Sequence, residues 1–256
     1  MLLAYVLGIE RIGLYTSFDR PLSPEEKANF RQVVKRRFSG EPTQYIVEKQ
    51  EFWSLDFFVS PAVLVPRADT EVLVEEALAF LDQRNRQGRV LDVGTGSGAI
   101  AVSLAHECPE AEIYACDLSA DALEVAVKNV KTHSVTVQLA EGRVNAMAEH
   151  GPYDVVVSNP PYIPSATIET LMAEVRDYEP RLALDGGMDG LQVFHEIIPE
   201  AASMLSPGGW LGFEVEGARQ AGEVKVILER SNLWTEIRVR RDYSGLERVV
   251  CAQRIG

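Results

Sequence analysis

The 256-residue sequence has few residues that would hold a metal ion or a disulfide framework. Its three cysteines are odd in number and form no CxxC pair, so neither a disulfide scaffold nor a zinc site fits them. The four histidines form no HExxH set, and we predict no metal site. We expect a cytoplasmic protein with reduced, mostly buried thiols. These thiols belong to Cys108, Cys116 and Cys251.

Long apolar runs are also absent. No stretch approaches the length that a helix needs to span a bilayer. The short apolar run at residues 1–9 ends at Glu10 and Arg11, which is not typical of a signal peptide. We therefore expect no membrane partner.

The sequence has no excess of positive charge. Lys and Arg number 25 against 38 Asp and Glu, which gives a formal net charge of −13. Proteins that bind duplex DNA usually neutralise its phosphates with a basic surface. The acidic balance therefore makes DNA a poor first candidate for a partner.

The composition is that of an ordinary globular protein, with 46% hydrophobic and 25% charged residues. The length suits one α/β domain with a small appendage. We expect a helical domain over residues 1–50, a β-hairpin linker over 51–69 and a larger domain over 70–256. Within the first part, helix signals predict helices at Leu2–Leu7 and Pro24–Phe38.

From residue 88 onward, apolar strands alternate with helices. The predicted strands are Arg89–Val93, Glu112–Cys116, Val135–Leu139, Tyr153–Val157, Trp210–Val215, Trp234–Arg240 and Arg248–Ala252. The predicted helices are Thr70–Leu81, Ala99–Glu107, Ala120–Lys131, Leu191–Leu205 and Ala218–Arg230. This order is typical of a doubly wound, mostly parallel, seven-stranded sheet with helices on both faces, a Rossmann-like α/β fold. The last two strands predict an antiparallel hairpin at the sheet edge.

A glycine-rich loop follows the first of these strands. Glycines permit a tight turn and let a ligand approach the backbone closely, and the next helix offers free N–H groups. Ligands in open α/β sheets bind at the carboxyl ends of strands, where this loop lies. The predicted cofactor-binding residues of the loop are Asp92, Gly94, Thr95, Gly96, Ser97 and Gly98.

The loop pattern also fits a relaxed dinucleotide fingerprint. Asp117, at the end of the second strand, would hold ribose hydroxyls with either ligand. Asp92 favours a cationic ligand over a dinucleotide, because a carboxylate before the first glycine would repel a pyrophosphate and attract ammonium and sulfonium groups. S-adenosylmethionine (SAM) carries both cations. The alternatives are glycines that only pack a helix on a strand, and Asp117 as a helix N-cap.

A second motif, Asn159-Pro160-Pro161-Tyr162, follows the strand Tyr153–Val157. Its prolines make a stiff backbone that can hold an amide and carbonyls rigidly. An amide or aromatic –NH2 is a poor nucleophile, because its lone pair is delocalised. The Asn159 side-chain oxygen and the Pro160 carbonyl would orient such a group and stabilise its developing positive charge, while Tyr162 would form an apolar wall. The alternative is a merely rigid turn.

We therefore predict that Asn159, Pro160 and Tyr162 are catalytic and that these residues, with Pro161, bind the substrate.

With both motifs present, the chain resembles the class I SAM-dependent methyltransferases, and more closely the release factor glutamine methyltransferase (PrmC/HemK) family. The resemblance extends from about residue 2 to residue 250. Other segments that match this family are 40–46, 63–71, 174–180, 183–187, 189–191 and 242–249.

The resemblance implies methyl transfer from SAM to the glutamine side-chain amide in the Gly-Gly-Gln loop of class 1 peptide release factors. It implies that Gly94–Gly98 cradle the methionine part of SAM, that Asp117 holds its ribose and that Val144 flanks its adenine. Asn159–Tyr162 would receive the glutamine, with Asn159 also contacting the cofactor. Residues 1–45 would contact the release factor.

The sequence departs from this family in three places. Its helical domain is short for the family, and we expect either a truncated N-terminus or a reduced partner-binding surface. Arg143 stands where the family usually has an acidic residue. Ala68-Asp69 replaces a more usual Pro-Glu pair.

Several other functions share parts of this pattern. A DNA adenine-N6 methyltransferase, or another protein amide or amino methyltransferase, would share both motifs. A nicotinamide-dependent oxidoreductase would use the glycine loop but would leave Asn159–Tyr162 unexplained. A non-catalytic scaffold would need a damaged site, and both motifs are intact.

Overall fold

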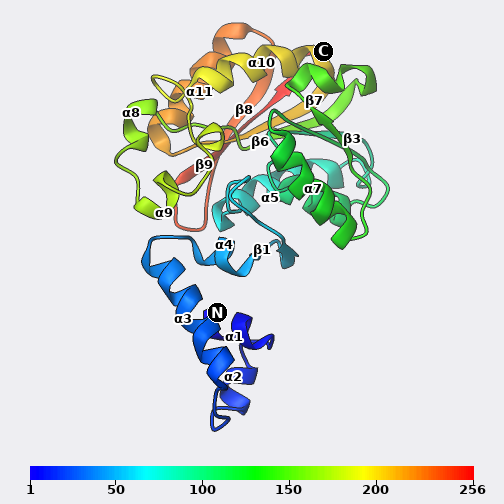
Figure 1. Ribbon diagram of the computed structural model, residues 1–256. Coiled ribbons are helices and arrows are strands. Elements are labelled where there is room, and N and C mark those ends of the chain that lie inside the picture. The colour runs from blue at the N-terminus through cyan, green and yellow to red at the C-terminus, as the bar shows by residue number, and fades with distance from the viewer.

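A seven-stranded sheet forms the centre of the computed structural model, which describes residues 1–256 (Figure 1). Its strands are β3 (Arg89–Val93), β4 (Glu112–Asp117), β5 (Gln138–Glu141), β6 (Tyr153–Ser158), β7 (Leu205–Glu214), β8 (Trp234–Arg241) and β9 (Glu247–Arg254). They lie in the order β5-β4-β3-β6-β7-β9-β8. Neighbours from β5 to β7 are parallel, and β9 runs antiparallel to β7 and β8. The predicted doubly wound sheet and its edge hairpin are confirmed.

Two strands differ from the prediction in their bounds. β5 begins three residues later than expected, because its ladder with β4 pairs Gln138 with Tyr114 and ends at Glu141. β7 begins at Leu205, five residues before the predicted start. Leu205 pairs with Tyr153 ahead of a register shift, so Pro207, Gly208 and Gly209 lie inside an irregular strand.

Long helices cover both faces of the sheet, as predicted. They are α5 (Glu71–Asp82), α6 (Ala99–Glu107), α7 (Ala120–Thr132), α10 (Gln192–Met204) and α11 (Ala218–Ser231). Side chains of β3 alternate between the faces, as the period of a strand requires. Val90 packs in a cluster with α5 and α6 residues, and Leu91 packs in another with α10 and α11 residues. The sheet is thus buried on both sides.

The first residues form a helical lobe that lies below the sheet in Figure 1. Its helices are α1 (Leu2–Leu7), α2 (Gly13–Thr16), α3 (Pro24–Phe38) and α4 (Thr43–Val47). The predicted helices α1 and α3 are confirmed at both ends. A capping box between Ser23 and Glu26 fixes the start of α3.

Short helices that the sequence did not predict also lie at the end of the linker, between β5 and β6, and after β6. They are η1 (Ala68–Thr70), η2 (Val144–His150), α8 (Ser165–Ile168), α9 (Ala173–Arg176) and η3 (Arg181–Ala183). An ion pair of 2.8 Å joins Arg37 of α3 to Glu174 of α9 and so ties the helical lobe to this region. None of the helices combines the length and the apolar character that crossing a bilayer requires. The three cysteines are free and buried.

The predicted linker contains an antiparallel hairpin of β1 (Gln50–Phe52) and β2 (Leu55–Phe57). The following chain is held by the buried side chain of Asn129, on α7. Its Oδ1 accepts from the backbone N–H of Phe58 at 2.8 Å. Its Nδ2 donates to the carbonyls of Phe58 and Ser97 at 3.0 and 2.8 Å. One amide therefore connects the linker, α7 and the glycine loop.

We predict that Asn129→Ala lowers the free energy of unfolding by about 2–4 kcal/mol, because three backbone groups lose their partner. Urea denaturation measures this change. Asn145→Ala is the matched control, since Asn145 is exposed, and its effect is expected within about 0.5 kcal/mol. Equal stabilities of the two variants would contradict this role for Asn129.

Candidate active site

A cavity of about 300 Å³ opens where β3, β4 and β6 end. The parallel register pairs Val93 with Cys116 on one side and with Ser158 on the other, so the segments that follow these strands meet. Nine residues that the sequence singled out line this cavity: Gly94, Thr95, Gly96, Ser97, Asp117, Val144, Asn159, Pro160 and Pro161. Asp92, Gly98 and Tyr162 do not line it and lie around it.

The glycine loop is bound closely to the end of β4. The N–H groups of Gly94 and Thr95 both donate to the carbonyl of Cys116, at 2.8 and 3.1 Å. Gly94 and Gly98 have φ of 74° and 82°, a backbone conformation that favours glycine. Gly98 also caps α6, where an added Cβ would lie 3.4 Å from the Cβ of Ala126. The loop conformation therefore depends on these glycines.

Asp117 lies in the cavity wall at the end of β4. Its Oδ2 accepts from the N–H of Gly96 at 2.8 Å and its Oδ1 from the N–H of Ser119 at 2.9 Å. Burial raises the pKa of Asp117 above its usual value, and these backbone hydrogen bonds offset only part of that rise. The N-cap of α7 is Ser119, so Asp117 is not the helix cap. Carboxylate oxygens accept more than one hydrogen bond, which leaves Asp117 able to bind hydroxyl groups.

Asp92 lies within β3 and is fully buried. Its Oδ2 accepts from the hydroxyl of Thr95 at 2.7 Å, whereas its Oδ1 has no partner. Burial raises the pKa of the Asp92 carboxyl to about 7. A buried carboxylate with an unpaired oxygen favours a nearby cation, which would stabilise its charged form.

The motif that follows β6 is held from several sides. Ser158 donates to the carbonyl of Val93 at 2.7 Å, which joins the end of β6 to the end of β3. The Asn159 Nδ2 donates to the hydroxyl oxygen of Thr70 at 3.3 Å. Gln220 of α11 donates to the carbonyl of Tyr162 at 3.1 Å. The carboxamide of Asn159 therefore lies on a fixed backbone at the cavity wall.

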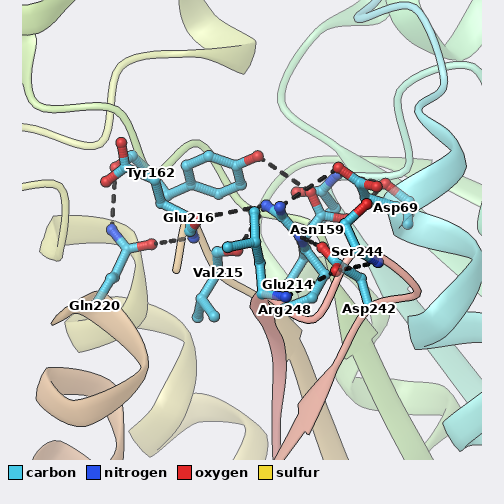
Figure 2. A network of polar contacts seen from close by, with 12 residues as sticks. Asp69, Asn159, Tyr162, Glu214, Val215, Glu216, Gln220, Asp242, Ser244 and Arg248 are labelled. Carbon is cyan, nitrogen blue, oxygen red and sulfur yellow. Dashed lines mark hydrogen bonds and ion pairs between the residues drawn. The ribbon is translucent and has the colours of Figure 1, made fainter. Parts of the chain in front are cut away.

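Tyr162 and Glu214, the last residue of β7, belong to a polar network beside the cavity (Figure 2). The Tyr162 hydroxyl donates to Glu214 Oε1 at 3.1 Å, and Thr70 donates to Glu214 Oε2 at 2.5 Å. Burial raises the pKa of Tyr162 above its usual range. Burial also raises the pKa of Glu214. Hydrogen bonds from Thr70 and Tyr162 and the charge of Arg248 offset only part of this rise.

Arg248 is held in place beside Glu214 by two carboxylates. Its Nε donates to Asp242 at 3.1 Å, and its Nη2 lies 3.4 Å from Asp69. Burial alone would lower the pKa of Arg248. The hydrogen bond to Asp242 and the charges of the nearby carboxylates outweigh burial, so the pKa of Arg248 is raised. A buried positive charge thus compensates the buried acid.

Thr70 and Glu214 were not predicted from the sequence as site residues. One signal pointed to Glu214: a charged residue ends an otherwise apolar strand at the edge where ligands bind. Thr70 had no such signal, because its contact with Glu214 joins residues 144 positions apart. At the far wall of the cavity, Arg143 forms an ion pair with Glu196.

Family models match two parts of the chain. The PrmC N-terminal domain matches residues 1–47, and the methyltransferase small domain matches residues 69–177. A methyltransferase structure from Pyrococcus furiosus covers 88% of this chain and 98% of its own, with a TM-score of 0.57 and 18% identity, which shows the shared fold.

Curated relatives are similar over the whole chain. The release factor glutamine methyltransferase of Geobacter sulfurreducens is 47% identical over 100% of this chain and 88% of its own length. That of Moorella thermoacetica is 43% identical over 99% of this chain and 89% of its own. With this identity over nearly its full length, the chain belongs to the release factor glutamine methyltransferase family.

Proposed function

We propose that this enzyme transfers a methyl group from SAM to the side-chain amide nitrogen of the glutamine in the Gly-Gly-Gln loop of class 1 peptide release factors. The observation that carries this proposal is the shared cavity. The glycine loop after β3 and the Asn-Pro-Pro segment after β6 line the same space. A methyl donor and a planar amide can therefore meet there.

The residues of the cavity suit SAM. Asp92, with its unpaired buried oxygen, would compensate the positive charge of the ligand. Asp117 would accept hydrogen bonds from the ribose hydroxyls, and Val144 would pack against the adenine. SAM supplies a methyl group that is activated by its bond to a sulfonium. The loop Gly94–Gly98 would hold the methionine part against its backbone.

The second segment would hold the substrate amide. The Asn159 Oδ1 and the carbonyl of Pro160 would accept the two hydrogens of the glutamine –NH2. These acceptors would stabilise the positive charge that develops on nitrogen, and neither has to be a strong base, because the proton can leave after methyl transfer. The stiff backbone keeps the reorganisation cost low.

The helical lobe would provide the docking surface for the release factor. We assign this role to residues 1–50, with 51–69 as linker and 70–256 as the catalytic domain. Of the basic residues on α3, Arg36 pairs with Glu41 and Arg37 pairs with Glu174, so both are occupied within the chain. The net charge of −13 favours a protein partner over DNA.

A direct test supplies the enzyme with labelled SAM and three acceptors. These are a class 1 release factor, the same factor with its Gly-Gly-Gln glutamine replaced by alanine, and duplex DNA. We expect label only on the first, with the mass of one methyl group located on the glutamine by peptide mass spectrometry. Label on DNA alone, or none on the intact release factor, would refute the proposal.

The role of Asn159 has its own test. We expect Asn159→Ala to lower turnover by about 10²–10⁴-fold, because one preorganised acceptor for the developing charge is lost. SAM binding, measured by calorimetry, should be nearly unchanged. Near-normal turnover of this variant would show that Asn159 does not hold the amide.

The role of Asp92 predicts a pH dependence of SAM binding. A carboxyl with a pKa of about 7 is largely protonated at pH 5 and must ionise to face a cation. SAM affinity should therefore rise by up to about tenfold per pH unit below pH 7 and level off above about pH 8. The raised pKa of Asp117 acts in the same direction.

Calorimetric titrations between pH 5 and 8 measure this rise. Asp92→Asn keeps the size of the side chain and removes its charge. We expect this variant to bind SAM more weakly at pH 8 and with a flatter pH profile. An identical slope in both proteins would assign the titration to another group.

A further inference from the structure

The hydroxyl of Thr70 lies between a buried carboxylate and the Asn159 carboxamide. It donates to Glu214 at 2.5 Å, and its oxygen accepts from Asn159 Nδ2 at 3.3 Å. Thr70 occupies the N-cap position of α5, where a threonine hydroxyl usually accepts from a backbone N–H, but it makes no such bond. Its hydroxyl instead links Glu214 to Asn159, and we call these two hydrogen bonds the relay.

The relay has a defined direction. An ionised carboxylate only accepts hydrogen bonds, whereas a hydroxyl has a single hydrogen to donate. Because Glu214 takes the hydrogen of Thr70, the Thr70 oxygen can serve Asn159 only as an acceptor. The –NH2 end of the Asn159 amide must therefore face Thr70, and its Oδ1 must face away from it.

We infer that Glu214 is a positioning residue, which acts through the Thr70 hydroxyl to decide which end of the Asn159 amide meets the methyl-accepting nitrogen. This inference rests on the proposed function. A substrate –NH2 presents two donors and needs acceptors. With the Asn159 amide reversed, two –NH2 groups would face each other and the substrate would lose its orientation.

Burial raises the pKa of Glu214, but two donated hydrogen bonds and a nearby positive charge favour the ionised form, which only accepts. Arg248 supplies positive charge close by, and the Tyr162 hydroxyl donates to the other carboxylate oxygen. The acids Asp69 and Asp242 are nearest to Arg248 and hold it there. Figure 2 shows Arg248 beside Glu214, with Tyr162 and Asn159 in the same network.

Two kinds of substitution separate this role from simple packing. Glu214→Gln keeps the shape of the side chain but can donate to Thr70, which frees the Thr70 hydrogen to bond with Asn159 Oδ1 and so reverses the amide. Thr70→Val removes the hydroxyl and keeps the branched shape. Thr70→Ser keeps the hydroxyl and is the matched control.

We expect Glu214→Gln and Thr70→Val each to lower kcat for release factor methylation by about 10–100-fold. The SAM dissociation constant and the KM for the release factor should change less than about threefold, because the affected bond serves orientation. Thr70→Ser should retain turnover within about threefold of the wild type. A loss in Thr70→Ser as large as that in Thr70→Val would overturn the inference.

The double variant supplies the decisive comparison. If Glu214 acts through Thr70, adding Glu214→Gln to Thr70→Val should lower kcat by less than about threefold more. Multiplied losses would mean that the two residues act independently and would reject the relay. Should Glu214→Gln fail to fold, the Thr70→Val and Thr70→Ser pair still decides, since both leave the carboxylate in place.

The wild-type assay separates this inference from the proposed function. Failure of the wild-type enzyme to methylate the release factor glutamine refutes the function itself. Normal wild-type methylation, together with wild-type kcat in both Glu214→Gln and Thr70→Val, refutes only the relay.

Discussion

The pairing of β3 with β6 is the contact on which the site depends. Its register sets Val93 opposite Ser158, and the Ser158 hydroxyl bonds to the Val93 carbonyl. Parallel strands end at the same edge of a sheet, so the glycine loop and Asn159 emerge side by side. A shift of one residue in this register would turn the side chains of one strand to the opposite face and separate the two segments.

Buried carboxylates at this sheet edge form the second common feature. Asp92 of β3 and Glu214 of β7 are both inaccessible to solvent, and burial raises the pKa of each. Such groups cost stability unless a partner compensates them. Glu214 has its compensation within the chain, from Thr70, Tyr162 and Arg248, whereas one oxygen of Asp92 has none. This difference suits a positioning role for Glu214, and it leaves Asp92, which lies beside the cavity and not in its lining, with an uncompensated oxygen.

Local signals explain where prediction succeeded. α3 has the predicted bounds because its capping box and first-turn proline act within a few residues. β3 also has its predicted bounds, because its mostly apolar run ends at a glycine. β5 and β7 were placed less well, since their ends follow from pairing with β4 and β6. Val63 and Val65, which follow the hairpin, pack into a buried cluster without joining a strand.

The sequence by itself determined the fold class and the two motifs that line the cavity, because strand–helix alternation, glycine loops and proline-rich turns are written in neighbouring residues. Only the tertiary structure decided which side chains orient those motifs. Thr70 reaches Asn159 and Glu214 across 89 and 144 residues of chain. It also placed the Tyr162 hydroxyl against Glu214. Hydrogen bonds between residues so distant depend on how the strands and helices pack, and no local pattern encodes that geometry.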